Sequence, residues 1–167
     1  MKRTGVLFLI LVLSVSLCSC RAEKPGALER INTVRESFGE SLSKVSVFYS
    51  GAEEGSAGYV DDALLSAILG GGEYPSAMSG CFEYAFLCSS EISLCEVWVI
   101  ECRTYSSARE VYALFEKRKK LLTSPQYEND RDVSAAQGTV LERVGKYVYF
   151  VVNEKGADIL HYLKHGT

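Results

Sequence analysis

The residues with the most chemistry in this chain are its six cysteines, because a thiol can be acylated, oxidised to a disulfide or used as a nucleophile. Two of them end an apolar run near the start of the sequence, and the other four recur every seven residues further along. These positions are Cys18 and Cys20, then Cys81, Cys88, Cys95 and Cys102. The spacing separates a candidate modification site from a candidate disulfide set.

The start of the chain predicts export. Lys2 and Arg3 precede residues 5–17, an apolar run that contains no charge. A basic segment followed by an apolar one of this length is typical of a secretory signal peptide. As a helix, the run rises only about 20 Å, which is short of the roughly 30 Å hydrocarbon core of a membrane.

The end of this run resembles the lipobox of bacterial lipoproteins, in which an aliphatic residue and two small residues precede the lipidated cysteine. The sequence Leu17-Cys18-Ser19-Cys20 places Cys20 in that position. Cys18 fits poorly, because Leu17 would then occupy a position that needs a small residue. We expect residues 1–19 to be removed and Cys20 to carry the two acyl chains that stable anchoring requires. The alternatives are an ordinary signal peptide with two incidental cysteines, or an uncleaved anchor.

Composition predicts a folded domain held at the outer side of the cell membrane. The part from Cys20 onward has 16 Lys and Arg against 21 Asp and Glu, a formal charge of −5. This balance disfavours nucleic acid and anionic lipid as partners. Of the whole chain, 47% is hydrophobic, including ten tyrosines, which is typical of a protein with a core. Outside the signal peptide, no stretch reaches the roughly 18 apolar residues of a membrane helix.

The first half of the chain predicts a tether and two helices. After the signal peptide, residues 20–27 form a short tether, 28–57 an N-terminal helix with a connecting segment, and 58–167 the main domain. Residues 44–49 can form an early strand. Asp61 is placed to cap a short Leu-rich helix that Gly70 to Gly72 would end. The apolar residues of the first helix recur every three or four positions, at Leu28, Ile31, Val34, Phe38, Leu42 and Val45.

The second half predicts two β-hairpins separated by a helix. Residues 81–88 and 95–102 alternate and are rich in aromatic and β-branched side chains. Ser107 and Glu110 have the spacing of a capping box that opens a helix. Residues 123–137 form a polar connection to a second hairpin with a Gly145-Lys146 turn, and a last helix spans about 154–164. The order ααββαββα predicts an α+β fold with four to five antiparallel strands and helices on one face.

The seven-residue spacing predicts the register of the first hairpin. With its centre between Glu91 and Ile92, Cys88 faces Cys95 and Cys81 faces Cys102, and the two pairs lie on opposite faces of the sheet. A disulfide is compatible with either pair. If one bridge forms, we expect Cys81–Cys102, because side chains approach more closely at its non-hydrogen-bonded site. Otherwise we expect the cysteines to be buried free thiols, which are common small hydrophobic residues in protein cores.

The hairpin, the following helix and the last strand resemble a family of small lipoproteins of Gram-positive anaerobic bacteria that is classed as a domain of unknown function. The matching stretches are EYAFLCSS, CEVWVIECRTYSSAREVYALFEKRKKLL and VGKYVYFVV, and the likeness covers about residues 60 to 160. The resemblance implies a lipid-anchored envelope domain and assigns no catalytic residue. Its matching positions are Tyr84, Glu96, Arg118, Gly145, Tyr147 and Val148.

Two other motifs offer weaker chemistry. His161 and His165 have the i, i+4 spacing of zinc ligands, but no glutamate follows the first histidine and no third ligand is evident. Ser41 and Lys44 form an S-x-x-K pattern, which an amphipathic helix explains as well. We interpret both as ordinary helix surface.

Two charged stretches have equally plain interpretations. The basic run Glu116–Lys120 can touch anionic head groups, but it also suits a solvated helix C-terminus. Residues 128–132 offer oxygen atoms without the frame of a calcium loop. The sequence also carries no nucleotide-binding glycine motif, and we predict no cofactor.

Our leading hypothesis is a non-enzymatic, lipid-anchored module that binds an envelope protein or wall polymer outside the membrane. The alternative is a small hydrolase or thiol-dependent enzyme that uses one of the four domain cysteines. A nucleophilic cysteine needs a base within hydrogen-bond reach. Both histidines lie on the last predicted helix, away from the cysteine-rich hairpin, which favours binding over catalysis.

Overall fold

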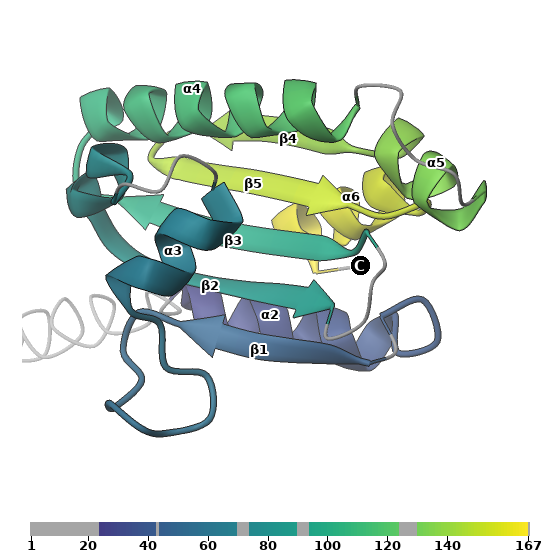
Figure 1. Ribbon diagram of the computed structural model, residues 1–167, viewed down its shortest axis with the longest axis horizontal. Helices are drawn as coiled ribbons and strands as arrows, with labels where there is room; N and C mark the ends of the chain where they lie inside the picture. Colours follow the sequence, from purple (N-terminus) through teal and green to yellow (C-terminus); the bar gives the residue numbers. More distant parts are fainter. Residues whose placement is uncertain (1–23, 43, 70–73, 90–93, 124–129, 167) are drawn as a thin grey trace, which may run out of the picture.

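The computed structural model describes residues 24–42, 44–69, 74–89, 94–123 and 130–166. Its centre is a five-stranded antiparallel sheet in the order β1-β2-β3-β5-β4 (Figure 1). The predicted α+β class and antiparallel sheet are confirmed. The strands are β1 Val45–Tyr49, β2 Cys81–Ser89, β3 Glu96–Cys102, β4 Val140–Val144 and β5 Tyr147–Val152. The helices are α2 Ala27–Ser37, α3 Asp62–Leu69, the 3-10 helix η1 Ser76–Gly80, α4 Tyr105–Leu122, α5 Asp130–Gln137 and α6 Gly156–His165.

Helices cover both faces of the sheet, so the expectation of helices on one face is not confirmed. One core cluster joins the sheet to α3, η1, α4 and α5, and the other joins it to α2 and α6. The reason lies in β3, where Val97 and Val99 face α2 while Trp98 and Ile100 face α4, all four at 0% exposure. A strand that is apolar on both faces must be covered on both.

An apolar row crosses the sheet on the α4 face. Phe48, Phe86, Trp98 and Phe150 are direct cross-strand partners on four neighbouring strands. The rings of Phe86 and Trp98 stack with centroids 3.8 Å apart, and Phe115 of α4 meets Trp98 edge-on at 5.2 Å. Cross-strand aromatic pairs of this kind stabilise a sheet beyond the area they bury. The row therefore fixes how the strands align.

The first hairpin has one predicted pair and one pair that differs. Cys81 faces Cys102, as predicted, but Cys88 faces Glu96 instead of Cys95. The register shifts by one residue between Cys81 and Glu83, which is a β-bulge at Phe82. Because a one-residue slip exchanges the faces of a strand, Trp98 faces Phe86 and not the expected Ala85. The expected turn centre at residues 91–92 lies outside the described residues.

Local signals predicted one helix cap and one turn correctly and placed a second cap too late in the chain. The Asp61 carboxylate accepts a hydrogen bond from Leu64 N at 2.6 Å and caps α3. Gly145 has a φ of +63° in the turn between β4 and β5, a conformation that glycine adopts without strain. The cap of α4 is Thr104, whose side chain accepts from Ser107 N at 3.0 Å, so this helix starts before the expected capping box.

The residues before position 58 belong to the same sheet and core as those after it. β1 forms the early strand expected at 44–49 and pairs with β2 along its length. α2 buries Ala27, Ile31 and Val34 against the sheet. Two helical elements were not predicted: the 3-10 helix η1, and α5, which lies within the stretch 123–137 that the sequence analysis interprets as a polar connection.

Candidate functional site

Three sulfur-containing side chains meet where β2 begins and β3 ends. Cys81 and Cys102 are cross-strand partners with 7% and 1% exposure, and Met78 Sδ of η1 lies 4.0 Å from Cys81 Sγ. Hydrogen bonding to Cys102 and burial raise the pKa of the Cys81 thiol. The same hydrogen bond lowers the pKa of Cys102, which accepts it. Both thiols are free, and they form the neighbouring pair that a disulfide would require.

The other two cysteines lie on opposite faces of the sheet, which the bulge at Phe82 explains. Cys88 packs with the α4-side cluster, whereas Cys95 belongs to the α2-side cluster and accepts a hydrogen bond from Asn153 Nδ2 at 3.6 Å. A disulfide between them would have to cross the sheet. Burial raises the pKa of the Cys88 thiol to about 11, and the negative charge of Glu96 contributes to this increase.

Neither histidine is placed to activate these thiols. His161 and His165 are exposed on α6, with ring centroids 4.7 Å apart. Their rings therefore neighbour each other, as the i, i+4 spacing predicts. Within the described ranges, no group of three or more His, Cys, Asp or Glu side chains could hold a metal ion.

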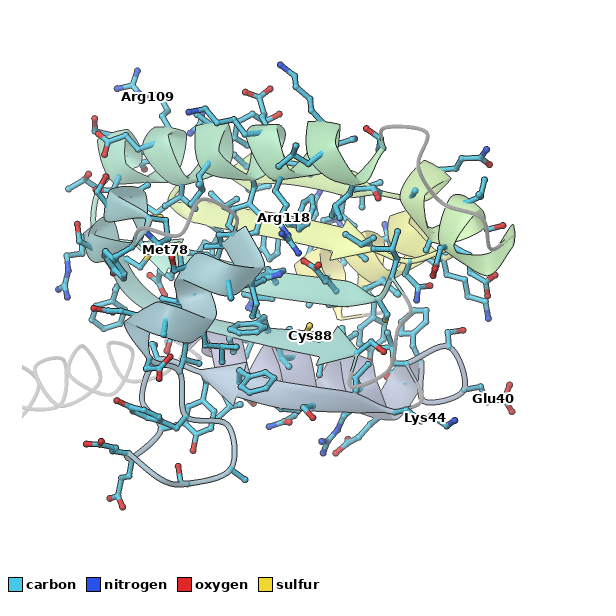
Figure 2. All side chains as sticks on the ribbon, viewed as in Figure 1. Glu40, Lys44, Met78, Cys88, Arg109 and Arg118 are labelled. Carbon is cyan, nitrogen blue, oxygen red and sulfur yellow. The ribbon has the colours of Figure 1, made fainter. Side chains whose placement is uncertain are left out.

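An ion pair between Arg118 and Glu96 joins α4 to the sheet beside Cys88. Figure 2 shows Arg118 between α4 and the sheet. Arg118 of α4 donates from Nε to Glu96 Oε2 at 2.9 Å, and its Nη2 pairs with the other carboxylate oxygen. Trp98 Nε1 donates to Glu96 at 3.2 Å, and Arg118 Nη1 donates to the carbonyl of Ile68 in α3. The two charged side chains are 14% and 7% exposed. The cluster ties α3 and α4 to β3.

The sequence contains a signal for this ion pair that our interpretation missed. Arg118 follows Val111 by seven residues and Phe115 by three, so it lies on the buried stripe of α4. Both interpretations of the run Glu116–Lys120 in the sequence analysis, contact with head groups and a solvated helix end, require its side chains to be exposed. Glu116, Lys117 and Lys120 are exposed as expected, but Arg118 is directed inward.

The remaining candidate motifs have structural roles. The Ser41 carbonyl oxygen accepts a hydrogen bond from Asn153 Nδ2 at 3.3 Å. Lys44 is exposed and has a φ of +64°. In the acidic stretch, the Asp132 carboxylate accepts from Leu94 N at 2.8 Å. Residues 128 and 129 lie outside the described residues, as do Cys18 and Cys20.

A groove of about 560 Å³ runs between α2 and the edge strand β1. Its apolar lining includes Leu28 and Val47, and its polar lining includes Asn32, Arg35 and Ser46. Mostly apolar walls with a few polar groups are typical of ligand sites. Among the lining residues, Arg35 is the charged one. Sequence reasoning gave no signal for this groove, because its two walls come from elements whose packing was unknown.

Comparisons of the chain with protein-family models, curated proteins and solved structures found no match. The resemblance to the lipoprotein family therefore stays a prediction. In the part of the chain that the structure describes, no helix is long and apolar enough to cross a membrane.

We predict that Arg118→Met lowers the free energy of unfolding by about 3–5 kcal/mol, because it leaves the Glu96 carboxylate buried without its cation. The matched control is Lys117→Met on the exposed side of the same helix, which should change stability by less than about 0.5 kcal/mol. Urea unfolding of the chain from residue 20 measures both. Equal effects of the two substitutions would contradict the assigned role of the ion pair.

We predict that oxidation of the native protein with diamide, which takes up two electrons and two protons, links Cys81 to Cys102. Peptide mapping should find this bond also in a Cys88→Ser/Cys95→Ser chain, because neither of those thiols takes part in it. Cys88 and Cys95 should not form a bond with each other, because they lie on opposite faces of the sheet. The bond should stabilise the fold by roughly 3 kcal/mol. A bond between Cys88 and Cys95 in the native protein would contradict the observed register.

Proposed function

We propose that this chain is a lipid-anchored lipoprotein on the extracytoplasmic side of the cell membrane, with a folded domain that binds a partner there. The observation that carries the proposal is the order of segments in the chain. A basic start, an apolar run and Leu17-x-x-Cys20 are followed at Ala27 by the first helix of the domain. Two acyl chains on one cysteine are sufficient for a stable anchor.

Binding is favoured over catalysis by the state of the domain thiols. A nucleophilic cysteine requires an accessible thiolate. Burial raises the pKa of Cys88 to about 11, and Cys102, whose pKa is lowered by its hydrogen bond with Cys81, is only 1% exposed. Cys81, Cys95 and Cys102 are buried, and the two histidines are exposed on α6. These positions weigh against the thiol-dependent enzyme that we kept as the alternative.

The groove between α2 and β1 is the binding surface that we favour. Its apolar walls can receive a partner side chain, and the Arg35 guanidinium can pair with a carboxylate. We therefore propose an acidic segment of an envelope protein as the partner. A wall polymer that carries carboxylates is the other outcome of the test.

Lipidation is tested by two single substitutions. In intact cells, Cys20→Ser should abolish incorporation of a fatty-acid probe, because it removes the thiol that is acylated. Cys18→Ser should leave incorporation unchanged. If Cys18→Ser abolishes the label and Cys20→Ser does not, the assigned position of the anchor is wrong.

Binding is tested by photo-crosslinking from defined positions. A benzophenone side chain at Asn32 should capture one discrete species in intact cells, and Arg35→Glu should remove that product because it reverses the charge in the groove. The matched control carries the same side chain at Glu110, which is exposed on α4. Mass spectrometry then distinguishes a protein from a wall polymer. Equal capture from both positions, unaffected by Arg35→Glu, would contradict the groove as the binding surface.

A further inference from the structure

One end of the sheet carries exposed aromatic side chains. Phe82 and Tyr105 are each 63% exposed, and Val144 is 45% exposed. They lie at one end because β2 begins, β3 ends and β4 ends there, in register with the start of β5. Tyr105 lies against the β4–β5 turn, where a Cβ on Gly145 would be 3.9 Å from its ring. We call Phe82, Tyr105 and Val144 the aromatic end.

The bulge at Phe82 creates part of this surface. It inserts one residue between Cys81, which is buried, and Glu83, whose carboxylate accepts a hydrogen bond from Ala27 N at 2.5 Å. The Phe82 ring is thereby exposed to solvent, although Cys81 before it and Tyr84 and Ala85 after it pack into the two cores. Bulges redirect single side chains in this way and often accompany functional surfaces. The exposed Phe82 ring at this bulge is therefore a candidate contact point for another surface.

The described chain begins beside this same end. The bond from Ala27 N to Glu83 holds the start of α2 next to the residue that follows Phe82. Only four peptide steps separate Cys20 from Lys24, and they span at most about 14 Å. The opposite end of β2, at Ser89, lies about 27 Å farther along the strand. An anchor on Cys20 thus holds the aromatic end within reach of the membrane.

Basic side chains surround the aromatic end and could contact a membrane surface. Arg103, Lys146 and Arg143 are exposed next to it, and Lys24 precedes the first helix. Acidic side chains also lie at this end: Glu83 accepts a hydrogen bond from Ala27 N, Glu101 accepts one from Tyr147, and exposed Asp62 lies near Tyr74 and Tyr84. Exposed basic side chains near an anchor are attracted to anionic lipid, and aromatic rings favour the head-group region.

We propose that the aromatic end rests on the bilayer, with Phe82 and Tyr105 at head-group depth and Arg103, Arg143 and Lys146 against anionic lipid head groups. This inference rests on the proposed lipid anchor. It leaves the α2–β1 groove facing along the membrane surface, accessible to a partner in the envelope. The membrane contact is thus a second interaction surface, separate from the groove.

The test replaces the natural anchor, so that its result does not depend on lipidation of Cys20. A hexahistidine segment takes the place of residues 1–23 and holds the complete described domain on vesicles that contain nickel-chelating lipid. Phe82→Trp introduces a reporter at the aromatic end. The matched control is Leu121→Trp, at an α4 position of similar exposure, 59%, near the other end of that helix. Trp98 is buried in both chains and contributes the same background.

On vesicles with phosphatidylglycerol and lipids brominated near the head group, emission of the Phe82→Trp chain should shift to the blue and be quenched. Emission of the Leu121→Trp chain should not change. Without the histidine segment, Lys146→Ala should weaken vesicle binding about fivefold, the effect of one lost cation near the surface. Equal quenching of the two chains, or none in either, would overturn the proposal. Failure of lipidation itself would appear separately, in the probe experiment on Cys20.

Discussion

The architecture depends on the burial of β3 on both faces. Its central residues, Val97, Trp98, Val99 and Ile100, have no exposed surface. At about 25 cal/mol for each Å² of apolar surface, leaving either face open to water would cost several kcal/mol in this strand alone. One helical layer is therefore insufficient. The chain uses α2 and α6 on one side and α3, α4 and α5 on the other.

The Glu96–Arg118 pair fits into this arrangement as an orienting contact. Two buried charges contribute little more to the free energy of unfolding than an apolar pair would. Removing one of them lowers that free energy strongly, because the other charge is left buried without a partner. The bidentate geometry, the Trp98 donor and the carbonyl of Ile68 allow one position of α4 relative to β3 and α3. Because helices cover both of its faces, the sheet itself is accessible only at its strand ends and along its edges. The aromatic end and the α2–β1 groove are two such places.

The sequence predicted those parts of the fold that depend on local patterns. Strand alternation gave both hairpins, and Asp61 and Gly145 gave a helix cap and a turn, because their effect needs only neighbouring residues. Non-local features were missed. The bulge at Phe82 shifts the register so that Phe86 faces Trp98 across the sheet, which the spacing of the cysteines alone does not reveal. Arg118 lies on the buried stripe of α4, but its partner Glu96 is 22 residues away in the sequence.

The central claim is that α2 and β1 form one cooperative unit with the rest of the sheet, since they close the face that Val97 and Val99 present. Native-state hydrogen exchange of the unlipidated chain from residue 20 tests this most directly. The account predicts that the amides of Ile31 and Val34 in α2 exchange with the same free energy as the amides of Val97 and Val99, equal to that of global unfolding. Exchange of the α2 amides at a much lower free energy, with β3 still protected, would contradict it.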